Sequence, residues 1–329
     1  MFTFKMRIAA LLAVTAAVLS GQAIGQTTDA ADLPAALVSD LHAAFGEHHA
    51  RAVHSKGIIL TGSFTPDAAA ATLTTAATFA KPVPVIVRFS DFTGIPDISD
   101  TNPLASPRGL AIKFDPDGAA DFDIVSHGFN GFPVATAEEF GQLLLALSAS
   151  GPGAAAPTPL DGFLADHPIA KTFLTTQKPA PESYATNAYF GVNAFEFTNA
   201  AGETAFVRYR FVPQAGERYL DPAASAGKAP DFLQAEIAER VASGPILFDW
   251  YAQVAGQGDD IDDPSIAWPE DRALVKLGTI TVDEVAPDQS TIDQSLLFIP
   301  SNVPDGIAPA DPMIDIRSNA YPISFGERQ

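Results

Sequence analysis

Residues 107–125 read Pro-Arg-Gly-Leu-Ala-Ile-Lys-Phe-Asp-Pro-Asp-Gly-Ala-Ala-Asp-Phe-Asp-Ile-Val. Side chains alternate in polarity over 109–114, which predicts a strand with one buried face. Asp115-Pro-Asp-Gly118 is a typical turn sequence, and the apolar residues that follow it at 122–125 predict a returning strand. The stretch therefore predicts an antiparallel β hairpin.

On both sides of this hairpin, the same patterns predict further strands and a few helices. The expected helices cover 27–49, where leucines recur every four residues, 137–147, which begins with a Thr136/Glu139 capping box, and 230–243. The expected strands cover 57–64, 84–89, 188–198, 204–212 and 273–285, and residues 151–159 and 300–312 are expected to be irregular or extended. No domain boundary is visible. The pattern indicates an α+β protein with an antiparallel β-barrel core and attached helices.

Composition excludes several classes of protein. The 329 residues are enough for one large domain, with 47% hydrophobic and 18% charged residues. The net charge of −20 disfavours a nucleic-acid or anionic-membrane partner, because binding phosphates requires a basic surface. The chain has no cysteine, which removes disulfides, thiolate nucleophiles, zinc–thiolate sites, iron–sulfur clusters and a haem held by thiolate.

The first 25 residues have the pattern of a cleavable signal peptide. Lys5 and Arg7 precede an apolar run over 8–19, and the segment ends in Ala23-Ile24-Gly25. An uncleaved membrane anchor is the alternative, but the run is shorter than the about 20 residues that cross a bilayer. We therefore expect a mature domain over 26–329 in the periplasm or outside the cell, with no membrane contact after cleavage.

The residues alone leave most candidate chemistry open. The six histidines show no His-x-x-Glu/Asp metal spacing, and His48 and His49 are adjacent, so they cannot present two ligands on one helix face. Ser90 lies in Phe-Ser-Asp without a nucleophile elbow, which disfavours a hydrolase. His54 by itself receives no role.

Arg317 and Tyr321 are four residues apart and would be neighbours on a helix, which we expect Pro322 to end. A fixed positive charge beside a phenol favours the phenolate, which can bind ferric haem. A surface Arg–Tyr pair is the alternative interpretation.

Taken together, the motifs resemble the haem catalase family. They are Arg-x-x-His-x-Lys-Gly at 51–57, Val-Arg-Phe-Ser at 87–90, Pro-Arg-Gly-x-Ala-x-Lys-Phe at 107–114, Asp-Ile-Val at 123–125, and Pro-Ser-Asn-Val-Pro-Asp-Gly-Ile at 300–307 followed by Arg317 and Tyr321. The resemblance covers roughly residues 30 to 329. Because the chain stops soon after Tyr321, it resembles the short branch of catalase-related peroxidases, which lacks the C-terminal helical domain.

The resemblance implies haem b (iron protoporphyrin IX) as the cofactor and a role for each matching residue. Tyr321 matches the iron ligand, Arg317 its phenolate-stabilising partner, His54 the distal acid/base and Ser90 the residue that orients it. Residues matching the haem-binding positions are Arg51, Arg88 and Arg328 for the propionates and Phe132 and Phe140 for the macrocycle. A homodimer is carried over from the family in the same way.

One position departs from the family pattern. The family has a distal Asn where this chain has His127, with Asn130 as a nearby alternative donor. Imidazole can also donate one hydrogen bond, but it is bulkier and can titrate. The change leaves peroxide cleavage intact and places in doubt the oxidation of a second peroxide. We therefore expect a peroxidase that reduces hydrogen peroxide or organic hydroperoxides with a small organic donor, and weak catalase activity.

Three alternatives remain open at this point. One is a hydroperoxide isomerase or dehydratase on the same scaffold. The second is a non-enzymatic haem-binding protein, which would need no distal His or Ser. The third is a secreted β-barrel binding protein without metal.

Overall fold

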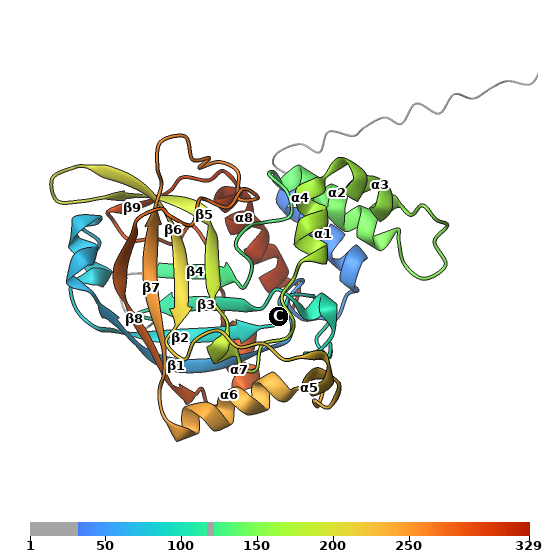
Figure 1. Cartoon of the computed structure of the whole chain (residues 1–329), viewed down its shortest axis with the longest axis horizontal. Helices are drawn as coiled ribbons and strands as arrows, with labels where there is room; N and C mark the ends of the chain where they lie inside the picture. The colour runs from blue at the N-terminus through green and yellow to red at the C-terminus, as the bar shows by residue number, and fades with distance from the viewer. Residues whose placement is uncertain (1–31, 117–121) are drawn as a thin grey trace, which may run out of the picture.

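Strands β1 to β8 close into an antiparallel barrel in the computed structural model, which describes residues 32–116 and 122–329. The strand order is β4-β3-β2-β1-β8-β7-β6-β5, and a β4–β5 pairing closes the ring. The strand bounds are β1 Gly57–Pro66, β2 Val83–Ser90, β3 Gly109–Phe114, β4 Phe122–His127, β5 Tyr189–Thr198, β6 Thr204–Pro213, β7 Ile246–Val254, β8 Leu274–Val285 and β9 Ile307–Pro309, which extends the sheet at β5. Figure 1 shows the barrel with helices along its side and below it.

The hairpin predicted from residues 107–125 is confirmed as β3 and β4. Gly109 pairs with His127 at one end and Phe114 with Phe122 at the other, where the two rings stack 4.8 Å apart. Part of the predicted turn, 117–121, lies outside the described residues. The strands expected at 57–64, 84–89, 188–198, 204–212 and 273–285 are also confirmed within one or two residues at most ends.

Helices cover the barrel and form a lobe beside it. The α-helices are α1 Leu33–Phe45, α2 Ala137–Ser148, α3 Pro159–Asp166, α4 Pro168–Thr175, α5 Pro222–Ala226, α6 Phe232–Ser243, α7 Gln289–Ser295 and α8 Met313–Gly326. Short 3₁₀ turns are η1 Ala68–Thr72, η2 Ala77–Phe79, η3 Pro103–Ala105 and η4 Tyr184–Thr186. Figure 1 shows α1 to α4 together at one side of the barrel, with α8 between them and the strands. No helix of the described chain is long and apolar enough to cross a membrane.

Two expectations for the helices need correction. Only half of the predicted capping box forms. The Thr136 hydroxyl accepts a hydrogen bond from Glu139 N, but the Glu139 carboxylate accepts one from Ala135 N instead of from Thr136 N. Pro322 does not end α8, which continues to Gly326. The ring removes one backbone donor, yet the helix resumes past it, where Glu327 N donates to Ile323 O at 3.1 Å.

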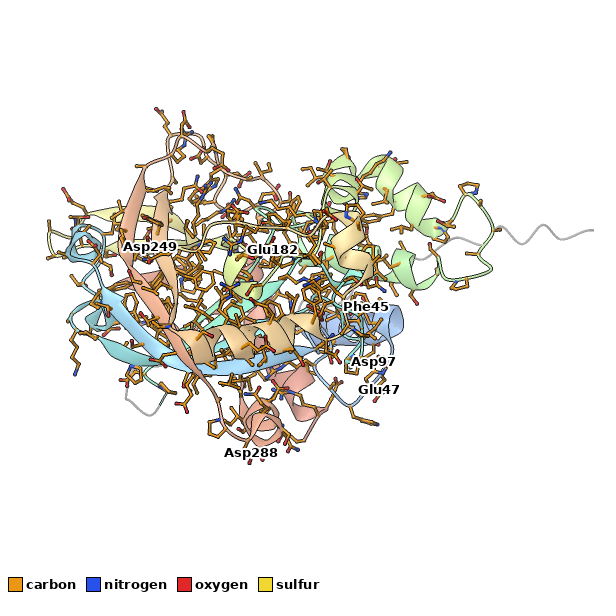
Figure 2. The ribbon with its side chains drawn as sticks, turned by 60° about the horizontal axis from the view of Figure 1, so that its bottom comes forward. Phe45, Glu47, Asp97, Glu182, Asp249 and Asp288 are labelled. Carbon is orange, nitrogen blue, oxygen red and sulfur yellow. The ribbon has the colours of Figure 1, made fainter. Side chains whose placement is uncertain are left out.

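Many of the side chains that fill the barrel interior are aromatic, and Figure 2 shows how densely side chains occupy the space between the strands. Trp250 from β7 lies at its centre, stacked on Phe211 at 5.7 Å and edge-on to Tyr209 and Phe64. All four are fully buried. Truncating such a ring costs roughly 3–5 kcal/mol. This packing makes the barrel a solid core, so a ligand has to bind at its end or side rather than through its middle.

Candidate active site

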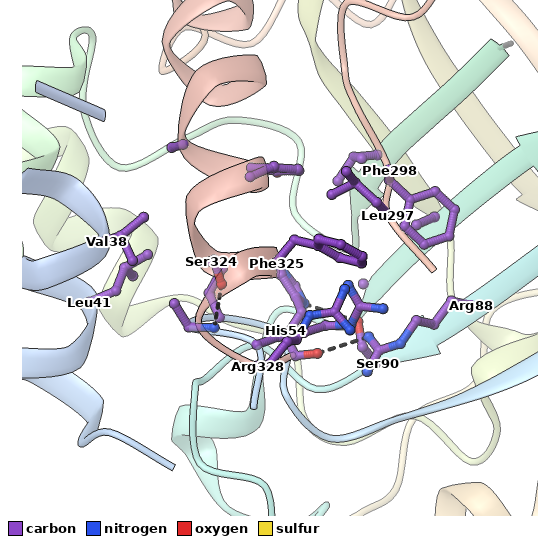
Figure 3. Close-up of a pocket in the computed structure, with 18 of the residues that line it drawn as sticks. Val38, Leu41, His54, Arg88, Ser90, Leu297, Phe298, Ser324, Phe325 and Arg328 are labelled. Atoms are coloured by element: carbon purple, nitrogen blue, oxygen red, sulfur yellow. Dashed lines mark hydrogen bonds between the residues drawn. The ribbon is translucent and has the colours of Figure 1, made fainter. Parts of the chain in front are cut away.

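The cavity that brings together most of the predicted site residues, called the main cavity below, lies between α1, α8 and one end of the barrel and has about 770 Å³ of empty volume including open solvent. It is lined mostly by apolar side chains. The polar residues at its wall are Arg51, His54, Arg88, Ser90, Ser126, Tyr321, Ser324 and Arg328. Figure 3 shows Ser324 and Phe325 of α8, and Arg328 just beyond it, facing His54, Ser90 and Arg88 at the barrel end, with Val38 and Leu41 of α1 on the other side.

Tyr321 lies on α8 and is held by Arg317 one turn earlier. Arg317 Nη2 donates to the Tyr321 phenol oxygen at 2.6 Å, and Nε lies 3.2 Å from the same oxygen. The helix brings the two together, as the i,i+4 spacing predicts. One cation thus places two hydrogen-bond donors on the phenol oxygen at the cavity wall.

Sequence reasoning missed the residues that hold Arg317 itself. Arg317 Nη1 donates to Asn193 Oδ1, and Asn193 Nδ2 donates to Asp311 Oδ2 at 2.7 Å. Asn193 and Asp311 are both buried. Asn193 lies where the β5–β6 register shifts between Gly191 and Phe195, and such a bulge re-aims a side chain. Only the structure could reveal this, because a bulge has no clear sequence signal.

His54 borders the same cavity in an unusual backbone conformation. Its φ is +56°, in the left-handed region that costs energy for a residue with a side chain. Its Nδ1 lies 3.0 Å from Ser90 Oγ. Gly109 makes the pair possible, because a Cβ there would lie 2.4 Å from Ser90 Oγ and 2.7 Å from His54 Nδ1.

The electrostatics keep His54 neutral. Burial, together with His127 and the Arg88 guanidinium, lowers the pKa of His54 to about 3. If Nδ1–H donates to Ser90 Oγ, the Nε2 lone pair remains free. A neutral imidazole with a free nitrogen is what a general base requires.

His127 lies at the end of β4, where its pairing with Phe190 closes the barrel. Its Nδ1 accepts a hydrogen bond from the backbone N–H of Phe129 at 3.3 Å, and its buried Nε2 has no hydrogen-bond partner among the described residues. Burial, with the charge of Arg317, lowers the pKa of His127 to about 3, so its ring is neutral too. An Nε2–H is therefore available as a donor.

Asn130 does not take the place of His127 in the site. Its amide nitrogen lies 3.3 Å from the Glu270 carboxylate in an exposed contact. Phe132 and Phe140 pack on each other at 5.0 Å, and Phe140 contacts the apolar cluster of α1 and α2. Neither ring is part of the wall of the main cavity, and His127 does not line it either.

Three arginines of the cavity wall contact α7 or the residue that follows it: Arg51, Arg88 and Arg328. Arg88 Nε and Arg51 Nη2 lie 2.7 and 3.2 Å from Asp293 Oδ1, and Arg328 Nη2 donates to Leu296 O at 2.8 Å. Burial and the charge of Arg88 lower the pKa of Arg51 to about 9. Burial raises the pKa of Asp293, but Arg88 and Arg51 outweigh it and hold that pKa below its ordinary value.

This cluster has an excess of positive charge. Three guanidinium groups face one carboxylate, and Arg51 Nε is buried without a partner in the described chain. A ligand with two carboxylates would balance the charges, and guanidinium binds carboxylates well. The cavity thus has the features of a site for an apolar ring with two carboxylate arms and an atom that binds a phenolate.

The family model named Catalase matches residues 39–328. Among curated proteins, the chain is 33% identical over 303 residues to the catalase-related peroxidase of Synechococcus elongatus, covering 90% of this chain and 88% of the relative. It is 37% identical over 280 residues to the catalase-related peroxidase of Mycolicibacterium paratuberculosis, covering 83% and 87%. Catalase-2 of Bacillus subtilis is 28% identical over 294 residues, covering 82% of this chain but 42% of that one.

Solved structures share the fold. A fungal catalase superposes with a TM-score of 0.75 at 22% identity, covering 85% of this chain and 59% of that chain. Catalase A from Saccharomyces cerevisiae gives the same TM-score at 20% identity, covering 85% and 61%. The barrel with its helices is therefore the catalase fold, in a chain shorter than these two proteins.

Proposed function

Because this chain belongs to the catalase family, it is an oxidoreductase that acts on peroxide, and we propose that it is a haem b peroxidase. Its substrates are hydrogen peroxide or organic hydroperoxides, its reductant is a small organic donor, and its catalase activity is weak. Proteins of the family depend on haem. The relatives of matching length carry the name catalase-related peroxidase.

The observation that carries the proposal is the arrangement around one cavity. Tyr321, held by Arg317, and His54, paired with Ser90, both border it. A haem-binding protein without enzymatic function would need only the first pair. The second pair supplies the proton acceptor that peroxide cleavage requires.

The residues present fit a haem. The guanidinium excess over Asp293 matches two propionates, and the apolar wall suits a macrocycle. The unpartnered Nε2 of His127 suits a polar ligand atom. Tyr321 would hold the iron, and Arg51, Arg88 and Arg328 would face the propionates. Phe132 and Phe140 remain proposed contacts of the macrocycle, from beyond the cavity wall.

The chain's own part in the reaction is to move one proton and hold several groups in place. Bound haem supplies the Lewis-acidic iron and the electrons that cleave the O–O bond. His54 Nε2 accepts the proton of the hydroperoxide and returns it to the departing oxygen, which leaves as water or an alcohol. Ser90 keeps the imidazole in orientation through Nδ1. Arg317 holds the Tyr321 oxygen by two hydrogen bonds.

The preference for peroxidase over catalase rests on His127. A catalase cycle needs a second peroxide to be positioned beside His54 by a compact donor. The imidazole of His127 offers one donor, Nε2–H, but is bulkier than an amide, so it supports the first step better than the second.

The cellular setting is proposed from the sequence. Residues 1–25, the proposed signal peptide, lie outside the described residues. We propose export to the periplasm or the cell exterior, a mature domain over 26–329 and a homodimer. The net charge of −20 suits a protein that has no nucleic-acid or membrane partner.

Two measurements test the proposed function. Titrating the apoprotein with haem should give a saturable Soret band, and a protein that gives none is no haem enzyme. The loaded protein should then convert cumene hydroperoxide to its alcohol while it oxidises an organic donor. Rearranged or dehydrated products without donor oxidation would establish the isomerase alternative instead.

A further inference from the structure

Arg88 has a hydrogen-bonding pattern that a role in binding cofactor carboxylates does not explain. All three nitrogens of its guanidinium already have protein partners. Nε donates to Asp293 Oδ1 at 2.7 Å, Nη1 to His54 O at 2.8 Å and Nη2 to Ser55 O at 2.9 Å. The side chain is buried, at 4% exposure. Two of its three contacts therefore go to the backbone that carries the distal histidine.

That backbone is the strained turn at His54. A left-handed φ of +56° persists only where neighbouring groups fix it. On one side, His54 N donates to Phe92 O at 2.9 Å and Ser55 N to Thr93 O at 3.0 Å. On the other side, the carbonyls of the same two residues accept from the Arg88 fork. The turn is thus held from both sides, and Arg88 provides one of them.

The local sequence makes room for this contact. A Cβ at Gly57 would lie 2.7 Å from Arg88 Cζ, so a glycine lets the guanidinium run beneath the turn. A planar fork with fixed donor directions can reach two successive carbonyls and a carboxylate at once. A lysine ammonium keeps the charge but cannot hold all three partners in this geometry.

We propose that Arg88 is a positioning residue for His54, and that Asp293 orients it through Nε. The fork fixes the two carbonyls of the turn, which fixes the imidazole that Ser90 orients at Nδ1. Asp293 lies on α7, so the Arg88–Asp293 ion pair links α7 to the turn that carries His54. The inference rests on the proposed role of His54 as acid/base, and it assigns Arg88 a task that Arg51 and Arg328 do not share.

The experiment uses the haem-loaded full chain with Arg88→Lys, Asp293→Asn and, as the matched control, Arg328→Lys. Arg328 belongs to the same cluster, but its donors go to carbonyls of residues 293, 294 and 296. Two quantities are measured: the haem dissociation constant, from the Soret band, and the rate of cyanide association with the ferric protein from pH 5 to 8. Hydrogen cyanide must give up a proton as it binds, so its association rate reports the distal base.

We expect Arg88→Lys to slow cyanide association about tenfold, as the loss of one or two hydrogen bonds predicts, with haem affinity weakened no more than in Arg328→Lys. Asp293→Asn should slow it about threefold. Arg328→Lys should weaken haem binding and slow cyanide association clearly less than Arg88→Lys does. The inference is overturned if Arg88→Lys loses haem affinity but keeps the wild-type rate of cyanide association at every pH. If Arg88→Lys does not fold, an unchanged rate in Asp293→Asn overturns it equally.

The failure of the proposed function would look different. In that case the wild-type chain would bind no haem, or His54→Ala would associate with cyanide at the wild-type rate. Neither result depends on Arg88.

Discussion

Arg317 places two guanidinium nitrogens on the phenol oxygen of Tyr321, at 2.6 and 3.2 Å. The guanidinium is in turn held by Asn193, which bonds Asp311. A buried amide and a buried carboxylate thus fix the cation that contacts the phenol oxygen of Tyr321. Under the proposed function, the oxygen held in this way is the protein ligand of the haem iron.

Replacing Tyr321 by Phe should abolish tight haem binding, because the iron loses its only proposed protein ligand while the cavity keeps its shape. We expect the haem dissociation constant to rise by about a hundredfold or more, as for the loss of a strong ligand of roughly 3 kcal/mol. The measurement is a Soret titration of the apoprotein. Asn319→Ala is the control, since its side chain contacts only Asp315 O on the exposed side of the same helix. Equal affinity in the Tyr321→Phe variant would contradict the assignment.

Ser90→Ala should slow the reaction with peroxide without releasing haem. The variant leaves the buried His54 Nδ1 without its partner at 3.0 Å, so the imidazole loses its fixed orientation. We expect a loss of about tenfold in the second-order rate with hydrogen peroxide, which matches the usual cost of one buried hydrogen bond. Stopped-flow spectroscopy measures this rate. A wild-type rate together with normal haem content would show that Ser90 has no orienting role.

His127→Ala should reduce the peroxide reaction more than Asn130→Ala does. His127 has a buried, unpartnered Nε2, whereas Asn130 reaches an exposed contact with Glu270. We expect a loss of several-fold for the first variant and little change for the second. Initial rates at low peroxide concentration separate the two. Full activity in His127→Ala combined with loss in Asn130→Ala would reverse the assignment.

The buried histidines should make the apoprotein less stable in acid. Burial lowers the folded-state pKa of His54 and of His127 from 6.5 to about 3. Between these values the unfolded chain binds more protons than the folded chain, so the free energy of unfolding decreases as the pH falls from about 6.5 towards 3. The His127→Gln variant lacks one of the two histidines that bind a proton on unfolding. Its stability relative to the wild type should therefore rise between pH 7.5 and pH 5 in urea unfolding, and a difference independent of pH would refute the shift.

Much of the fold could be predicted, because local patterns decide local structure. The alternation over 109–114 and the turn sequence after it led directly to β3 and β4. Pro322 misled, since a proline inside a helix costs one hydrogen bond and packing of α8 outweighs that cost. The helices α3 and α4 were missed because the Ala/Pro/Gly-rich segment before them resembles a loop, and α3 buries no residue.

The candidate site was predictable only where a motif or a spacing carried it. The i,i+4 spacing of Arg317 and Tyr321 was sufficient to predict their contact. Asn193 and Asp293 could not be found, because a bulge and a long-range ion pair bring them to the site. The two partners of Arg88 at the turn of His54 were equally invisible, since they are backbone carbonyls.

The proposed preference for peroxidase over catalase activity can be tested on one haem-loaded sample by comparing the two activities at a single peroxide concentration. Oxygen release is followed with an electrode, and oxidation of an organic donor is followed by absorbance. Donor oxidation is expected to exceed oxygen release, because His127, at the end of β4, is bulkier than the compact amide that would position the second peroxide. Rapid, unsaturated oxygen release with negligible donor oxidation would contradict it.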